Sequence, residues 1–345
     1  MPTSNRPRNP SAHLAGQGAV GLLEERLRRH FGLPYALAVS SATTGLLATA
    51  LALDLRGAEF VTTPYTWGGT VAGWLLLGNR PRFADIDPVT LALSPASVSA
   101  ASTRRCRAIL AVDVFGVPAP HAALLAAARE RGAWYVLDAA QSLGAHVDGR
   151  ASGAEADVVV LSFTRGKALD VGEGGAILTP HAEVYQRLVW HTQHPLRQRL
   201  ELGASNEFAL NGRMHPAAAA LAVRAFDAAL ERVATRRSHA FRLLEAADAT
   251  RLVGPVVKPG QVAPSFFRLS ACWRREPRAQ RLEAALAAAG YRARVEPSPV
   301  RLLYRQEAFA DRYPAWAREA VCPRAERQEK LRFCLSDPAG TSRSL

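Results

Sequence analysis

One lysine of this chain stands where a protein can display an amine for covalent chemistry. Lys167 follows an apolar run, residues 158–161, and precedes a glycine-rich stretch, residues 172–175. An amine that is partly dehydrated and close to other positive charge is nucleophilic, so a lysine at a strand end can form a Schiff base with a carbonyl cofactor. The alternative is a solvated surface lysine, which is the usual state of a lone lysine. The other motifs of the chain decide between these two interpretations.

A carboxylate and an amide follow a second apolar run, residues 134–137. Asp138 can pair with a protonated pyridine nitrogen and so keep a cofactor ring ready to accept electrons. Gln141 comes three residues later and can hydrogen-bond a neighbouring ring oxygen. The structural alternative is that Asp138 caps the next segment, a common role for aspartate at a turn that opens a helix.

Two further stretches offer groups that suit a planar, anionic ligand. Thr43 and Thr44 place hydroxyls at the start of an expected buried helix, residues 46–53, where free N–H groups favour an anion. The same stretch equally fits a simple helix N-cap. Trp67 follows an expected strand beside two glycines and can stack on a planar ring, although most tryptophans fill a core.

The elements that position these residues alternate between strand and helix. The expected strands cover residues 59–62, 82–85, 106–112, 134–137 and 157–162. Helices expected at residues 69–77 and 121–131 lie between them. This alternation predicts an α/β fold whose mostly parallel sheet lies between helices, with the active site at the carboxyl ends of the strands. Asp138 and Lys167 both follow such ends.

The second half of the chain changes pattern. Residues 191–211 are polar and predict an irregular connection, and an alanine-rich helix over residues 216–233 is expected to join two domains. A smaller C-terminal α/β domain is expected from a strand at residues 265–273, a helix at 278–289 and strands at 291–295 and 331–335. The predicted division is a flexible arm at 1–18, a large domain at 19–230 and a small domain at 231–345.

Composition narrows the class of protein and of ligand. Among 345 residues, Lys and Arg exceed Asp and Glu by 13, but without a basic tract or a zinc-finger or RNA-binding signature, which disfavours a specific nucleic-acid role. A phosphorylated small molecule suits the same charge. Four widely spaced cysteines indicate neither a zinc site nor a disulfide framework, so the expected location is the reducing cytoplasm. Neither a signal peptide nor a membrane span is expected.

Six motifs, taken together and in order, resemble one known family. They are the Ser-x-Thr turn at 41–43, Pro-x-Thr-aromatic at 64–67, Asp-Ala-Ala-Gln at 138–141, Ser-Phe-x-x-x-Lys at 162–167, Gly-Glu-Gly-Gly at 172–175 and Asn-Gly-Arg-Met at 211–214. In this order the chain resembles the DegT/DnrJ/EryC1/StrS family over roughly residues 16 to 230. The resemblance implies pyridoxal-phosphate-dependent sugar aminotransferases of the aspartate-aminotransferase fold type I, with residues 19–230 as the cofactor-binding domain.

The resemblance also implies a role for each matching residue. Lys167 would hold pyridoxal 5′-phosphate as a Schiff base and move the proton, and Asp138 would pair with the ring nitrogen. Gln141 would bond the ring hydroxyl, and Trp67 would stack on the ring. The cofactor phosphate would be bound by Thr43, Thr44 and Ser162. Asn211 would reach the phosphate of a neighbouring subunit, which implies a homodimer with active sites shared across its interface.

Departures from the family pattern concern the substrate rather than the cofactor. Ala42 replaces a glycine, Asp113 stands where a histidine is common, and residues 295–300 replace a His-Tyr segment of the small domain. The expected reaction moves an amino group from glutamate or glutamine to a keto-sugar, in most relatives a nucleotide-linked one, in secondary-metabolite, antibiotic or surface-sugar biosynthesis. A cyclitol or another ketone, elimination or aromatisation with the same cofactor, and a non-catalytic ligand-sensing role stay as alternatives. No metal is expected.

Overall fold

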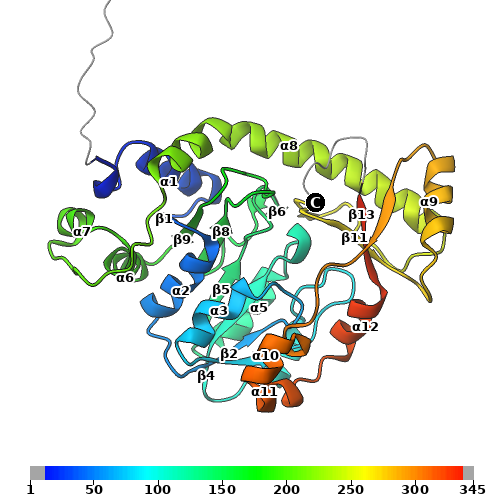
Figure 1. Cartoon of the computed structure of the whole chain (residues 1–345), viewed down its shortest axis with the longest axis horizontal. Coiled ribbons are helices and arrows are strands. Elements are labelled where there is room, and N and C mark those ends of the chain that lie inside the picture. The colour runs from blue at the N-terminus through cyan, green and yellow to red at the C-terminus, as the bar shows by residue number, and fades with distance from the viewer. Residues whose placement is uncertain (1–11, 337–345) are drawn as a thin grey trace, which may run out of the picture.

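The structure is a computed structural model that describes residues 12–336. A twisted seven-stranded sheet forms its centre, with strand order β1-β9-β8-β5-β4-β2-β3, and helices cover both faces (Figure 1). Its strands, in chain order, are β1 (Tyr35–Val39), β2 (Glu59–Thr62), β3 (Arg80–Phe83), β4 (Cys106–Val112), β5 (Trp134–Asp138), β8 (Val158–Ser162) and β9 (Gly175–Thr179). The expected fold class, a mostly parallel sheet between helices, is confirmed.

Strand direction separates the body of the sheet from one edge. Strands β3, β2, β4, β5 and β8 run parallel to one another. Strand β9 is antiparallel to both of its neighbours, β8 and β1. The sequence analysis did not predict β9, whose first residue, Gly175, belongs to the glycine-rich stretch. The chain leaves the sheet after Ser162 and returns beside it at Gly175, so Lys167 lies in the connecting loop, residues 163–174, over the strand ends.

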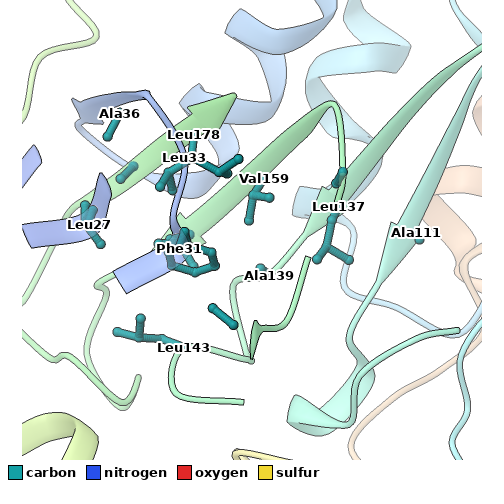
Figure 2. Packing of buried hydrophobic residues seen from close by; sticks show 14 of the residues in the cluster. Leu27, Phe31, Leu33, Ala36, Ala111, Leu137, Ala139, Leu143, Val159 and Leu178 are labelled. Carbon is teal, nitrogen blue, oxygen red and sulfur yellow. The ribbon is translucent and has the colours of Figure 1, made fainter. Parts of the chain in front are cut away.

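The two faces of the sheet bury separate cores. On one face β5 and β8 contribute Leu137, Val159 and Leu161 to a cluster with α1 and α8, part of which Figure 2 shows. On the other face Val158 and Val160 pack with α2, α3 and α6. Successive side chains of a strand point to opposite faces, so a strand covered on both faces is apolar throughout. The run at 158–161 is apolar for this reason.

The helices of the large domain mostly alternate with its strands along the chain. They are α1 (Ala19–Phe31), α2 (Ala42–Ala52), α3 (Gly69–Leu76), α4 (Pro95–Ala101), α5 (His121–Arg129), α6 (Ala182–Thr192) and α7 (Pro195–Leu202). Helix α7 corrects the expectation of an irregular connection at 191–211. It begins with Pro195 directly after the cap His194 and ends at Gly203, signals that the polar composition of the segment obscured. The expected arm and tail at 1–18 and 336–345 lie largely outside the described residues.

Helix α8 (Pro216–Ala249) runs along one side of the molecule and carries the chain toward the C-terminal elements (Figure 1). Its second half packs on a three-stranded antiparallel sheet of order β11-β13-β12 and on helix α9. The bounds of these elements are β11 (Leu269–Cys272), α9 (Ala279–Ala288), β12 (Arg294–Pro297) and β13 (Arg332–Ser336). The expected strand at 265–273 is thus limited to four residues. Residue 230 lies inside α8, and the division of the chain at 231 stays a prediction.

The last helices return to the large sheet. Helices α10 (Glu307–Arg312), α11 (Pro314–Glu319) and α12 (Pro323–Leu331) lie at its β3 edge (Figure 1). Leu302 and Phe309 share a core with Tyr65 and Val112 of the large domain. Three two-residue strands, β6 (His146–Val147), β7 (Arg150–Ala151) and β10 (Val262–Ala263), form a further small sheet. No helix among residues 12–336 combines the length and the apolarity that crossing a membrane requires.

Candidate active site at the carboxyl ends of the strands

A cavity of about 430 Å³ lies where β5 and β8 end and α2 begins. Its wall includes most of the residues that the sequence singled out, namely Thr43, Trp67, Asp138, Gln141, Ser162 and Lys167. Thr44 and Asn211 are not part of the wall. These residues come from five separate segments, and the parallel sheet brings them together because its strand ends meet at one edge.

Asp138 is the last residue of β5 and is only 5% exposed. Its Oδ2 accepts a hydrogen bond from Thr70 Oγ1 at 2.7 Å, and its Oδ1 accepts one from Ala140 N at 3.0 Å. The second bond closes a turn over residues 138–140, and no helix follows it directly, so the N-cap of the structural alternative is not formed. Burial raises the pKa of Asp138, against these hydrogen bonds and the attraction of Lys167. A ligand that brings a cationic N–H to this carboxylate would relieve that burial cost.

Lys167 lies in the loop between β8 and β9 and is partly buried in the cavity wall, so the solvated-surface interpretation is wrong. The loop is fixed by Asp170, whose carboxylate accepts from Gly166 N at 2.8 Å and from Gly172 N at 3.1 Å. The Lys167 Nζ atom is 4.1 Å from the centre of the Phe267 ring. Burial lowers the pKa of Lys167 and Arg268 lowers it further, while Asp138 opposes them. A larger share of the amine is therefore neutral and nucleophilic.

The start of α2 is capped by a side chain and also borders the cavity. Ser41 Oγ accepts from Thr44 N at 3.1 Å and so caps the helix. The hydroxyl of Thr44 bonds to Ser40 Oγ at 3.1 Å and to Ser41 Oγ at 3.0 Å, which keeps it within the turn and out of the cavity. Thr43 lines the cavity beside N–H groups that the helix leaves unused. The opposite wall presents Ser162, whose Oγ lies 3.0 Å from Thr164 Oγ1.

Trp67 and Gln141 border the middle of the cavity. The Trp67 side chain is 76% exposed, so the interpretation of this residue as core is wrong. It lies at the rim of the cavity, where a flat ligand would cover part of its ring. Gln141 Oε1 accepts a hydrogen bond from Phe115 N at 2.8 Å, which leaves the amide nitrogen as the group that can donate to a ligand.

Sequence reasoning missed several residues of the cavity wall. Thr66, which lies before α3, and Thr70 of α3 connect their hydroxyls at 2.9 Å and lead to Asp138. Thr66 belongs to the Pro-x-Thr-aromatic motif, which was the available signal. Phe267 and Arg268 enter the cavity from the C-terminal part of the chain and were interpreted as part of a strand. No local pattern could have identified them, because they reach the cavity through long-range contacts.

These groups fit pyridoxal phosphate by their chemistry. A helix N-terminus with Thr43 suits a phosphate, the buried Asp138 carboxylate suits a protonated ring nitrogen, and the Lys167 amine suits an aldehyde. Asn211 lies outside this arrangement on an exposed stretch between α7 and α8. Its expected contact with a neighbouring subunit stays a prediction.

Comparison with known proteins supports the same fit. The model of the DegT/DnrJ/EryC1/StrS aminotransferase family matches residues 13–336. Protein MosB of Rhizobium meliloti is 33% identical over 175 residues, which are 50% of this chain and 34% of that protein. A putative L-glutamine:3-amino-2,3-dideoxy-scyllo-inosose aminotransferase of Streptomyces kanamyceticus is 37% identical over 159 residues, 46% of this chain and 38% of that protein. The matches thus span little more than a third of these two relatives.

Solved structures match over nearly the whole chain. DesI, determined in the presence of its TDP-sugar product, superimposes with a TM-score of 0.75 at 28% identity, covering 94% of this chain and 82% of that one. DesV of S. venezuelae gives a TM-score of 0.77 at 26% identity, covering 95% and 86%. The arrangement of strands and helices described above is therefore shared with these proteins.

Proposed function

The chain belongs to the DegT/DnrJ/EryC1/StrS aminotransferase family, and on that premise we propose that it is a pyridoxal-phosphate-dependent aminotransferase. It takes an amino group from glutamate or glutamine and gives it to a keto-sugar, in nucleotide-linked form, or to a related ketone. The observation that carries the proposal is the pair of Lys167 and Asp138 in one cavity, with a half-buried amine facing the same space as a buried carboxylate.

Each residue of the cavity has a defined task in this reaction. Bound pyridoxal phosphate supplies the electron sink that stabilises a carbanion at the substrate. Asp138 would keep a proton on the ring nitrogen, and Gln141 would donate to the ring oxygen. Thr43, Ser162 and the first N–H groups of α2 would bind the phosphate, with Thr44 holding the turn in shape. Trp67 would contact the ring.

Proton transfer falls to Lys167. Its lowered pKa leaves Nζ able to take the proton from the α-carbon of the donor as a general base. The same atom later delivers a proton when the amino group passes to the acceptor. The hydrogen bonds that Asp170 accepts from Gly166 N and Gly172 N hold the chain at Lys167 in place for both transfers.

Quaternary structure and location are part of the proposal. We propose a homodimer in which Asn211 of each chain serves the site of the other, since Asn211 is exposed and does not line its own cavity. The protein is proposed to act in the cytoplasm.

A cyclitol is the second candidate acceptor. The Streptomyces kanamyceticus relative is named for an amino-dideoxy-scyllo-inosose, a cyclic ketone without a nucleotide. Pro299 and Val300 of the altered segment at 295–300 line the cavity, and these two apolar side chains suit a neutral ring as well as a sugar.

The experiment begins with the colour of the purified protein. Protein supplied with pyridoxal phosphate should show the visible absorption of the bound cofactor, and L-glutamate or L-glutamine should remove it. A panel of nucleotide-linked keto-sugars and cyclitol ketones should then restore it for the true acceptor. Protein that stays colourless with saturating cofactor would contradict the proposed function.

A further inference from the structure

Residues 265–268 carry an arginine into the active-site cavity from the C-terminal part of the chain. Ser265 is fixed on both sides, since its N–H donates to Gly116 O at 2.9 Å and its Oγ donates to Gln141 O at 2.8 Å. Arg268 N donates to Phe115 O at 3.4 Å. The segment is thereby tied to the large domain, beside Gln141, and it holds Arg268 in the wall of the cavity.

The charge of Arg268 is not matched by a carboxylate. Among residues 12–336, Arg268 forms no ion pair with an aspartate or a glutamate, whereas Arg324 pairs with Asp85 at 3.2 Å. The Arg268 side chain lies near the sulfur of Cys334. Burial raises the pKa of Cys334 to about 11, so this sulfur is a neutral thiol and does not balance the guanidinium. Phe267 offers a ring at 5.8 Å, which is also uncharged.

Arg268 lies close to the amine that carries the chemistry. Lys167 Nζ and Arg268 Cζ lie 4.1 Å and 5.8 Å from the centre of the Phe267 ring, so the two cations are within about 10 Å of each other. A half-buried arginine without an anionic partner, next to a reacting centre, is suited to bind an anionic group of the substrate.

We propose that Arg268 binds the α-carboxylate of the amino donor and so selects an α-amino acid for the first half of the reaction. The inference rests on the proposed aminotransferase function. An α-amino acid has its carboxylate on the carbon that reacts at Lys167, within reach of Arg268. The phosphates of a nucleotide-linked sugar are separated from the reacting carbon by the sugar ring, which places them farther from this pair. A planar guanidinium also matches the two oxygens of a carboxylate.

Binding of an unreactive dicarboxylate tests the inference directly. Glutarate has the carboxylates of the donor but no amine, so its dissociation constant can be measured by titration calorimetry on the cofactor-loaded protein. R268Q should bind glutarate roughly 10- to 100-fold more weakly, as expected for the loss of a hydrogen-bonded charge pair. R268K should recover part of the affinity, and R224Q, which changes an exposed arginine of α8, should bind like the unaltered protein.

Two further measurements distinguish the loss of the Arg268 charge from damage to the folded cavity. The neutral diamide of glutarate should bind equally to R268Q and to the unaltered protein, because it carries no charge for Arg268 to attract. R268Q should keep the visible absorption of the cofactor and the thermal unfolding midpoint of the unaltered protein, which shows that the cavity is intact.

Unchanged glutarate affinity in an intact R268Q would overturn the inference. So would an R268Q that binds glutarate normally but binds uridine diphosphate more weakly, since the arginine would then serve the acceptor. Either result leaves the aminotransferase function standing as long as the protein is coloured and an amino donor removes the colour. A colourless unaltered protein would instead count against the proposed function itself.

Discussion

Two regions of this protein bury charge, and they differ in what the charges face. Arg197 of α7 is 2% exposed and donates to both carboxylate oxygens of Glu24 in α1, each at 2.9 Å. Glu24 also accepts from Ala38 N at 2.9 Å, and Arg197 reaches Glu201 at 2.7 Å and Tyr185 at 3.0 Å. Every polar group in this region is satisfied within the chain.

The cavity at the strand ends is the opposite case. Asp138, Lys167 and Arg268 share one wall, yet none of the three is paired with an opposite charge at hydrogen-bond distance among the described residues. Buried charges that pair with each other hold helices and strands in fixed positions. Buried charges without an opposite charge beside them are available to a ligand. The comparison therefore predicts that damage to the first region costs stability and damage to the second costs activity.

The largest effect on activity is expected from a change in the active-site cavity. Lys167→Ala removes the group proposed to move the proton and should slow amino transfer by roughly 100- to 10,000-fold, the usual contribution of a general base. The visible absorption of bound cofactor should change as well. Lys258→Ala, which alters an exposed lysine, is the matched control and should behave like the unaltered protein. Transfer at a normal rate by Lys167→Ala would show that the base lies elsewhere.

A change in the Arg197–Glu24 region should instead lower the stability of the fold. Arg197→Met leaves the Glu24 carboxylate buried without its cation and should lower the free energy of unfolding by about 3–5 kcal/mol. The double variant Glu24→Leu with Arg197→Met removes both charges and should regain most of that loss. Denaturant unfolding followed by circular dichroism measures both variants. A double variant no more stable than the single one would mean that the pair contributes more than charge compensation.

His30 is a third case, because it is half-buried but belongs neither to the Arg197–Glu24 region nor to the active-site cavity. Its Nε2 has no hydrogen-bond partner among the described residues, its ring packs 5.9 Å from Phe226, and burial together with His146 lowers its pKa to about 4. The unfolded chain therefore takes up a proton near pH 6.5, before the folded one does. Stability should fall by roughly 3 kcal/mol as the pH drops from 6.5 to 4.

His30→Leu isolates that effect. The leucine cannot be protonated, so the slope of unfolding free energy against pH between 4 and 6.5 should become shallower in this variant. Equal slopes in both proteins would assign the acid sensitivity to other groups.

The smallest effect is expected from removing the hydrogen bond that Asp138 accepts from Thr70. Thr70→Val removes the hydroxyl that donates to Asp138 Oδ2 at 2.7 Å. That bond lowers the pKa of Asp138, so its loss should raise the pKa and move the acid limb of the activity profile to higher pH. The loss of one such bond corresponds to about 1–3 kcal/mol. Thr70→Ser keeps the donor and should retain the original profile.

Much of the fold and of the site was readable from local pattern. The strands Glu59–Thr62 and Cys106–Val112 have the predicted bounds, because each is a short apolar run between turn residues. Asp138 was recognisable since it directly follows such a run, and Lys167 since it comes between such a run and a glycine-rich stretch. Helix α7 was missed, because the residues that it buries, Arg197 and Gln198, are polar and its Leu200 is exposed, so it has no apolar face.

The sequence by itself determined which strands end in reactive groups, because strand propensity and the residues just beyond a strand are neighbours along the chain. Only the tertiary structure decided what those groups face. The Thr44 hydroxyl is bonded within its own turn, and Trp67 lies at the rim of the cavity and not in the core. Arg268 lies near Lys167 although the two are 101 positions apart in the sequence. Side-chain periodicity reports the contacts of a few residues, whereas the cavity wall is closed by contacts such as Ser265 with Gln141 that no local pattern encodes.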